Sequence, residues 1–174
     1  MSQETPWQLG NVPGPTIARP LEPKTFTRLM KKNSVFIVGI KVGEEGEEGE
    51  FLRKLTKVIA SKGIPIIASP SSEKMLREQG ITAKLAMNLP VLTKKLAMED
   101  WDNLGFIAES VAISGFYYYY QSQALAALRN NADKLKSISI DPYFSPNANY
   151  SSPSVPKKKL SEWYKEMIAA AEAI

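Results

Sequence analysis

Four short apolar runs, separated by stretches with helical spacing, constrain the fold of this chain more than any other feature of its sequence. The runs are Ser34–Val38, Ile64–Ala68, Ser110–Ser114 and Lys136–Ile140. The first shows no alternation of apolar and polar residues, which is typical of a strand buried on both faces of a parallel sheet. We therefore predict a three-layer α/β fold, in which helices cover both faces of a doubly wound, mostly parallel sheet of five to six strands.

The first two runs frame a strand–helix–strand unit. After Gly39 and an acidic, glycine-rich loop, apolar residues recur at helical spacing, namely Phe51, Leu52, Leu55, Val58 and Ile59. The sequence Ser61-Lys62-Gly63 ends this helix, because glycine suits the position after a helix C-terminus. The connection between the two parallel strands is expected to be right-handed.

The rest of the chain continues the same alternation. Further helices are predicted at about Lys24–Lys32, Glu73–Gln79, Val91–Ala97, Tyr118–Asn130 and Leu160–Ala171. The segment Ala83–Met87 indicates a short additional strand. Residues 141–156 are rich in Pro, Asn and Ser, and this irregular stretch has room for a short edge strand.

The chain divides into a proline-rich segment and one folded domain. Residues 1–23 contain five of the 12 prolines, which excludes a regular helix or a central strand there, because proline lacks a backbone N–H. We expect an extended arm, either as a disordered tail or held against its own domain or a neighbour by Trp7, Leu9 and Ile17. Residues 24–174 have the length and apolar content of a single α/β domain.

The chain contains no cysteine and no histidine. These residue types supply most soft-metal ligands, most nucleophile–base pairs and the usual proton shuttle at neutral pH. The chain therefore cannot ligate an iron–sulfur cluster through thiolates or build a Ser-His-Asp site. The sequence favours a non-catalytic subunit that binds a partner, a cofactor or both, with no catalytic residue and no metal ligand of its own.

Charge and hydropathy exclude two classes of partner. The net charge is +4, but the basic residues are scattered and the only basic triplet is Lys157–Lys159, so we expect no nucleic-acid partner. No apolar run approaches the roughly 18 residues of a membrane span. The first residues also lack the apolar region of a signal peptide. We therefore expect a cytoplasmic protein that does not contact a membrane.

A candidate cofactor site lies at the predicted carboxyl ends of the strands. In an open α/β sheet, ligands bind there, at the point where the strand order reverses. If Ser34–Val38 and Ser110–Ser114 are central neighbours, their ends form the walls of this crevice. Glycine lets a ligand approach the backbone closely, and an aspartate can accept hydrogen bonds from a ribose diol. The candidate residues for an adenine dinucleotide, such as FAD or NAD, are Gly39, Ile40, Gly115, Phe116 and Asp141.

A purely structural interpretation of these residues stays open. Glycine at a strand end and aspartate before proline are both ordinary in turns. The segment Gly39–Gly43 does not match the GxGxxG fingerprint of dinucleotide-binding loops. Glu47, Glu48 and Glu50 lie where the next helix begins, and carboxylates at a helix N-terminus repel a pyrophosphate.

Five consecutive aromatic residues, Phe116–Tyr120, form a candidate contact surface. Successive side chains of a helix point in different directions, so the five cannot share one face. Because aromatic residues are enriched in protein interfaces, we predict that Tyr117, Tyr118 and Tyr120 contact a partner, together with Trp7 of the arm. The other interpretation is that two or three of the aromatics pack in the core and the rest are half-exposed.

The strand segments resemble a known family. The residues that carry the resemblance are 33–39 (NSVFIVG), 60–69 (ASKGIPIIAS), 111–115 (VAISG) and 137–141 (SISID). They are similar to the epsilon subunit of the archaeal acetyl-CoA decarbonylase/synthase complex, also called the carbon monoxide dehydrogenase epsilon subunit, over about residues 24–174. The same pattern occurs in the central, FAD-binding-type domain of thiamine-diphosphate enzymes, but the thiamine domains of those enzymes are not in this chain.

The resemblance implies a six-stranded, Rossmann-like parallel sheet of the deoxyhypusine-synthase-like NAD/FAD-binding class. It also implies an accessory subunit that associates with the nickel–iron–sulfur alpha subunit of carbon monoxide dehydrogenase, as alpha-two epsilon-two, within a larger multienzyme complex. There the alpha subunit carries every metal cluster, and the epsilon subunit stabilises it or assists electron transfer to FAD, in acetate cleavage or carbon fixation. A stand-alone FAD- or NAD-binding redox protein is the alternative. The acidic loop and the aromatic Phe116–Tyr118 depart from the family pattern.

Overall fold

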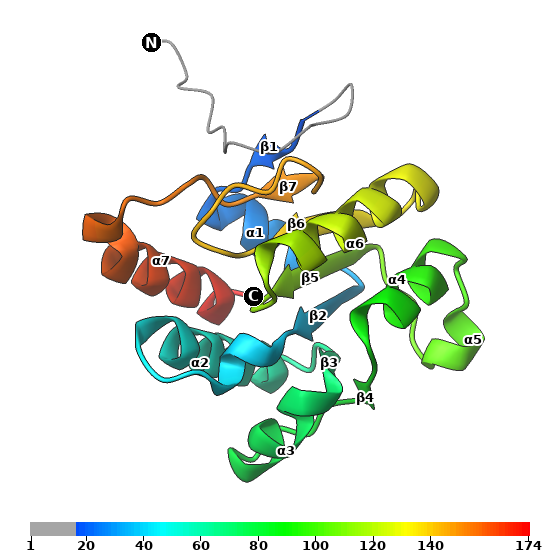
Figure 1. Cartoon of the computed structure of the whole chain (residues 1–174), viewed down its shortest axis with the longest axis horizontal. Helices are drawn as coiled ribbons and strands as arrows, with labels where there is room; N and C mark the ends of the chain where they lie inside the picture. The colour runs from blue at the N-terminus through cyan, green and yellow to red at the C-terminus, as the bar shows by residue number, and fades with distance from the viewer. Residues whose placement is uncertain (1–16) are drawn as a thin grey trace.

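The computed structural model describes residues 17–174, and its centre is a single seven-stranded sheet with parallel pairing throughout (Figure 1). The strands are β1 (Arg19–Pro20), β2 (Ser34–Val38), β3 (Ile66–Ala68), β4 (Leu85–Ala86), β5 (Ser110–Ser114), β6 (Lys136–Ser139) and β7 (Tyr150–Ser151). Their order across the sheet is β1-β7-β6-β5-β2-β3-β4. The predicted doubly wound parallel sheet is confirmed, with one strand more than the upper count expected from the sequence.

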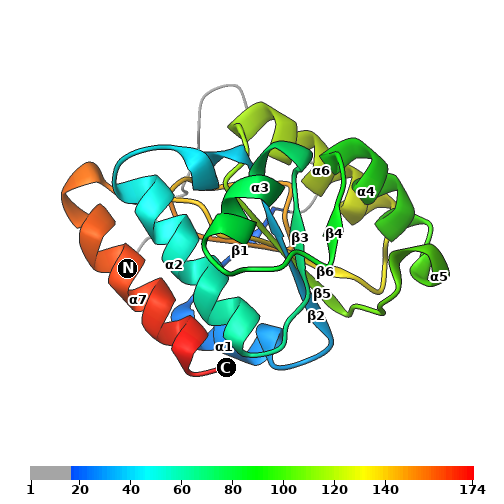
Figure 2. The same ribbon diagram turned by 90° about the horizontal axis from the view of Figure 1, so that it is seen from below.

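Helices cover both faces of the sheet. They are α1 (Pro23–Met30), α2 (Glu47–Ser61), α3 (Pro70–Glu78), α4 (Leu89–Ala97), α5 (Trp101–Leu104), α6 (Tyr118–Asn131) and α7 (Leu160–Glu172), with short 3₁₀ helices η1 (Ile40–Gly43) and η2 (Lys157–Lys159). Helices α1, α2 and α7 share one core with the sheet, and α4, α5 and α6 share the other (Figure 2). The three-layer, Rossmann-like architecture is thereby confirmed.

Strands β2 and β5 occupy the middle of the sheet because they offer apolar side chains to both helical layers. All five residues of each strand are buried. Phe36 and Val38 belong to the core that includes α1, α2 and α7, whereas Val35 and Ile37 belong to the core that includes α4 and α6. As predicted, the continuous apolar run marks a strand that is covered on both faces of the sheet.

Two short strands, β1 and β7, extend the sheet on the side of β6. The segment 141–156 contains β7, but β7 is not the edge strand that the sequence suggested, because β1 pairs on its outer side. Strand β1 belongs to the proline-rich segment, and its Pro20 lies on the outermost strand, where proline is tolerated. A strand of only two residues shows no alternation of apolar and polar residues in the sequence. This explains why the predicted number of strands is lower than the observed number.

The proline-rich segment is attached to the domain where the structure describes it. The Ala18 N–H donates to the Pro146 carbonyl over 3.0 Å, and the Leu21 N–H donates to the Ser151 carbonyl over 2.7 Å. The side chains of Ala18 and Leu21 are buried, whereas Ile17 is exposed. Trp7 and Leu9 lie outside the described residues 17–174.

The strand order reverses between β2 and β5. From β2 the chain continues to β3 and β4 on one side, and it then returns to β5 and continues to β6 and β7 on the other side. The ends of β2 and β5 are in register, with Val38 opposite Ser114. The pairing of these two central strands, which the candidate cofactor site required, is present, and it places the reversal where α/β proteins bind ligands. None of the helices within residues 17–174 has the length and apolar character that crossing a bilayer requires.

Candidate functional site

The loops that follow β2 and β5 contact each other through two glycines. The Gly39 N–H donates to the Ser114 carbonyl over 2.9 Å, and the Lys41 N–H donates to the Gly115 carbonyl over 2.9 Å. A Cβ atom at Gly39 would lie 2.2 Å from the Gly115 carbonyl oxygen, and Gly115 has a φ of +79°. Gly39 and Gly115 thus lie side by side, as expected for residues that follow neighbouring strands. The absence of side chains at these positions lets the two loops approach each other closely.

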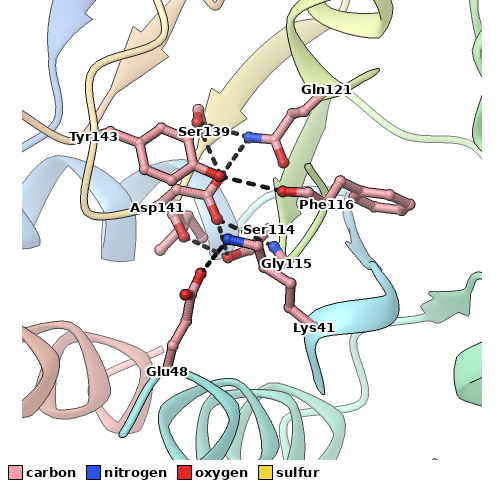
Figure 3. Close-up of polar contacts among 10 residues, drawn as sticks. Lys41, Glu48, Ser114, Gly115, Phe116, Gln121, Ser139, Asp141 and Tyr143 are labelled. Atoms are coloured by element: carbon pink, nitrogen blue, oxygen red, sulfur yellow. Dashed lines mark hydrogen bonds and ion pairs between the residues drawn. The ribbon is translucent and has the colours of Figure 1, made fainter. Parts of the chain in front are cut away.

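Asp141 lies at the end of β6, buried beneath these loops (Figure 3). Its Oδ1 accepts hydrogen bonds from the Ser114 hydroxyl over 3.0 Å and from the Gly115 N–H over 3.1 Å. Its Oδ2 accepts a short hydrogen bond from the Gln121 side-chain amide and a longer one, of 3.4 Å, from the Ser139 hydroxyl. Both carboxylate oxygens are therefore engaged by donors of the chain itself.

The surroundings of Asp141 raise the pKa of its carboxyl group above the usual value. Burial raises the pKa of its carboxyl group to about 6, and the negative charge of Glu48 acts in the same direction. The hydrogen bonds from Gly115, Gln121 and Ser114 oppose this rise, because they favour the ionised form. The carboxylate that the sequence suggested for a ribose diol thus closes a hydrogen-bond network inside the domain.

Gln121 is a part of this network that sequence reasoning missed. It lies in the first turn of α6, is fully buried, and also donates to the Ser139 hydroxyl over 2.9 Å. A signal was present, because Gln121 precedes the inward-facing Ala124 and Leu125 by three and four residues and so shares their helical face. Within residues 17–174 its Oε1 has no hydrogen-bond partner.

A second polar group borders the network on the side of α2. Lys41 Nζ pairs with Glu48 Oε1 over 2.9 Å, and the same ammonium lies 5.6 Å from the ring centroid of Tyr143. The Tyr143 hydroxyl donates to the Phe116 carbonyl over 3.2 Å, and burial raises the pKa of Tyr143. Glu47, Glu48 and Glu50 lie in the first turn of α2 as predicted. Lys41 holds one of these three carboxylates against the loop.

A pocket of about 300 Å³ opens at the same edge of the sheet. Ile40 and Phe116 line it, as do the predicted partner residues Tyr117 and Tyr120. Polar lining comes from the amino ends of α3 and α4, through Ser69, Ser71 and Asn88. Of the five candidate cofactor residues, two therefore line the pocket, namely Ile40 and Phe116, whereas Gly39, Gly115 and Asp141 do not line it.

The five consecutive aromatics have different surroundings. Phe116 is buried, and Tyr118 packs edge-on against Tyr143 at a centroid distance of 5.2 Å. Tyr120 is half-buried beside Phe116. Tyr117 and Tyr119 are 51% and 67% exposed, and their rings stack on each other at 6.4 Å. Tyr119 was not among the predicted contact residues, yet it is the most exposed of the five; Trp7 lies outside the described residues.

We expect the stability of the chain to depend on pH through Asp141. The carboxyl group has a higher pKa in the folded state than in the unfolded state, so the folded state binds the proton more tightly. The resulting contribution to the free energy of unfolding is greatest at low pH and is lost as the pH rises through about 6. Between pH 7 and pH 5 the free energy of unfolding of the native chain should rise by about 1 kcal/mol relative to that of Asp141→Asn. Urea titrations of both proteins at pH 7, 6 and 5 measure this difference; a constant difference contradicts the assignment.

We also expect Gly39→Ala to destabilise the chain by about 3 kcal/mol, because the added methyl group meets the backbone of Gly115. Gly43→Ala is the matched control in the same connection. Its Cβ atom would meet the end of the flexible Met75 side chain, which can move away, so the loss should stay within about 1 kcal/mol. Chemical denaturation followed by far-UV circular dichroism compares the two. Equal losses would show that the contact between Gly39 and Gly115 is not tight.

Comparison with known proteins agrees with the sequence resemblance. Residues 1–170 match the family described as CO dehydrogenase beta subunit/acetyl-CoA synthase epsilon subunit. The chain is 27% identical over 166 residues to the acetyl-CoA decarbonylase/synthase complex subunit epsilon of Methanothermobacter thermautotrophicus, covering 94% of each chain. It is 30% identical over 158 residues to subunit epsilon 1 of Archaeoglobus fulgidus, covering 87% of this chain and 81% of the relative. The chain therefore belongs to the family of CO dehydrogenase beta subunits and acetyl-CoA synthase epsilon subunits.

Proposed function

We propose that this chain is an accessory, epsilon-type subunit that docks on the nickel–iron–sulfur alpha subunit of a carbon monoxide dehydrogenase, as alpha-two epsilon-two within a larger complex. In this role it stabilises the alpha subunit and assists electron transfer to FAD. The family membership supports the proposal, and so do the relatives, which are named as epsilon subunits of acetyl-CoA decarbonylase/synthase complexes. A chain without cysteine or histidine fits a role in which the partner carries the metal chemistry.

The observation that carries the proposal is a concentration of exposed apolar side chains around the pocket at the sheet edge. Residues 17–174 contain seven large apolar side chains that are exposed. Four of them lie on η1, near the start of α4 and at the start of α6, and we call these the docking surface: Ile40, Val91, Tyr117 and Tyr119. Exposed apolar residues are common singly, but a group of this kind is typical of an interaction site.

The arrangement of the side chains suits docking better than catalysis. Tyr117 and Tyr119 present large, rigid rings that lose little conformational entropy when a partner covers them. Beneath them, Tyr118 and Tyr143 pack edge-on, and the Tyr143 hydroxyl is tied to the backbone of Phe116. The exposed rings are therefore mounted on a fixed base, as expected of residues that anchor an interface.

The docking proposal predicts co-purification that depends on the two exposed tyrosines. When the tagged full-length chain is expressed in its native organism, a large protein containing nickel and iron should be recovered with it. The double variant Tyr117→Ala/Tyr119→Ala should lower that recovery at least about tenfold, because truncation of aromatic anchors costs about 2 kcal/mol or more. Metal analysis of the eluate and gel filtration make the measurement.

Ile107→Ala is the matched control. Ile107 is as exposed as Tyr119, at 67%, but it lies before β5, at the opposite edge of the sheet. Its truncation should leave the recovery unchanged. Recovery of the native chain without any nickel- and iron-containing protein would contradict the proposal, and equal losses in the control and the double variant would place the docking surface elsewhere.

We infer a second candidate function, the binding of FAD or NAD, from the pocket at the sheet edge. The pocket adjoins the amino ends of α3 and α4, whose backbone N–H groups and dipoles attract phosphate. Ile40 and Phe116 offer apolar contacts, and their backbone is fixed next to the contact between Gly39 and Gly115 and the hydrogen bond from Gly115 to Asp141. The residues present fit a phosphate-bearing part of such a cofactor at α3 and α4, whereas the acidic first turn of α2 does not. Bound FAD would supply redox chemistry that the side chains lack.

If FAD binds, it should raise the melting temperature of the isolated chain, since ligand at 100 times Kd contributes about 2.7 kcal/mol. Ser71→Asp places a negative charge at the first turn of α3 beside the pocket and should abolish the shift while leaving the fold intact. Ser161→Asp, the same change at the first turn of α7, should preserve it. The absence of any shift with millimolar FAD, NAD or NADP removes this function for the isolated chain, and an equal shift in Ser71→Asp places the cofactor away from α3.

A further inference from the structure

A larger cavity, of about 570 Å³, lies between α4 and α6 on one face of the sheet. On α4 it is lined by one helical stripe, at Leu89, Pro90, Thr93, Lys94, Ala97 and, just beyond the helix, Met98. On α6 the matching stripe is Tyr120, Gln123, Ala124, Ala127 and Asn131. We call this cavity the α4–α6 groove. Its volume is in the range of small-molecule sites.

The groove is elongated and has a floor of small side chains. Ala97, Ala124 and Ala127 lie between larger residues at its two ends, namely Leu89 and Tyr120 at one end and Met98 and Asn131 at the other. The nine residues of α4 give it a length of about 13 Å, because a helix rises 1.5 Å per residue. A groove of this shape matches an extended apolar chain better than a compact polar ligand.

Two polar side chains mark where the head of such a ligand lies. Thr93 is 5% exposed, and its hydroxyl has no hydrogen-bond partner among residues 17–174. A buried hydroxyl without a partner is costly, and a bound polar atom relieves that cost. Lys94 is the next residue, and among residues 17–174 it is the one charged side chain that lines the groove. No carboxylate from this part of the chain lines the groove.

We infer that the α4–α6 groove binds a small amphipathic anion, with an extended apolar body and a single carboxylate-like head. The body lies on Ala97, Ala124 and Ala127, and the head lies against Thr93 and Lys94. The charge of Lys94 selects an anion over a cation, and the apolar floor selects an alkyl chain over a sugar or a nucleotide. The groove meets the pocket at the sheet edge through Leu89 and Tyr120, which line both, but the inference needs neither the proposed partner nor FAD.

The test compares three probes that share one eight-carbon chain and differ in their heads: octanoate, octan-1-ol and octylamine. They are titrated into the full-length, ¹⁵N-labelled chain and followed by amide chemical shifts. Octanoate should bind more tightly than octan-1-ol by up to about fivefold, octylamine should bind most weakly, and the shifts should cluster on α4 and α6. Equal affinity for the three probes, or shifts centred on other elements, would overturn the inference.

Matched variants locate the body and the head of the ligand. Ala127→Leu fills the groove and should lower octanoate affinity at least tenfold, whereas Ala126→Leu, the same change on α6 at a residue that does not line the groove, should not. Lys94→Gln should reduce octanoate to the affinity of octan-1-ol, and Lys57→Gln, at an exposed lysine of α2, should change nothing.

Thr93→Val tests the hydroxyl without opening a cavity. It should weaken octanoate about fivefold without lowering the melting temperature of the free chain, because valine removes a buried hydroxyl that has no hydrogen-bond partner among residues 17–174. Native affinity for octanoate in both Ala127→Leu and Lys94→Gln would refute the inference even if Thr93→Val behaved as expected.

Discussion

The close contact between the ends of β2 and β5 is the constraint on which the functional edge of this domain depends. Because Val38 lies opposite Ser114, the glycines that follow them meet. A side chain at Gly39 would collide with the neighbouring backbone. Asp141 then joins a third strand to the pair by accepting the N–H of Gly115. The buried carboxylate thus ties the ends of β5 and β6 to the first turn of α6, and the contact between Gly39 and Gly115 adds the end of β2 to this base.

This arrangement explains how a carboxylate is tolerated in the interior. Among residues 17–174 no cation forms an ion pair with Asp141, and Lys41 is paired with Glu48, so hydrogen-bond donors stabilise the Asp141 carboxylate. The hydrogen bonds from Ser114, Gly115 and Gln121 offset part of the cost of burying the carboxylate. The same burial raises the pKa of Asp141 to about 6, so this junction takes up a proton, and the fold gains stability, as the pH falls through that value.

The central strands of the sheet could be predicted from the sequence, whereas the short outer strands could not. Ser34–Val38 and Ser110–Ser114 were predicted with the bounds that the structure has, because burial on both faces leaves a continuous apolar run. Strands of two residues, such as Tyr150–Ser151, leave no such mark and exist only through their tertiary pairing. Asp141 was identified as notable, but its orientation depends on Gln121, which is 20 residues away in sequence, so no local pattern reveals that the carboxylate points inward.

The charge distribution at the strand ends separates this chain from a standard dinucleotide-binding fold. In that fold the pyrophosphate lies at the amino end of the first helix after the central strand. Here that helix is α2, whose first turn contains Glu47, Glu48 and Glu50. These carboxylates stabilise the helix and repel anions. The amino ends of α3 and α4 lack such charges except for Glu73, and they adjoin the pocket that Tyr117 and Tyr120 line. An anionic ligand and a protein partner would therefore meet at the same edge of the sheet, with the aromatic residues between them.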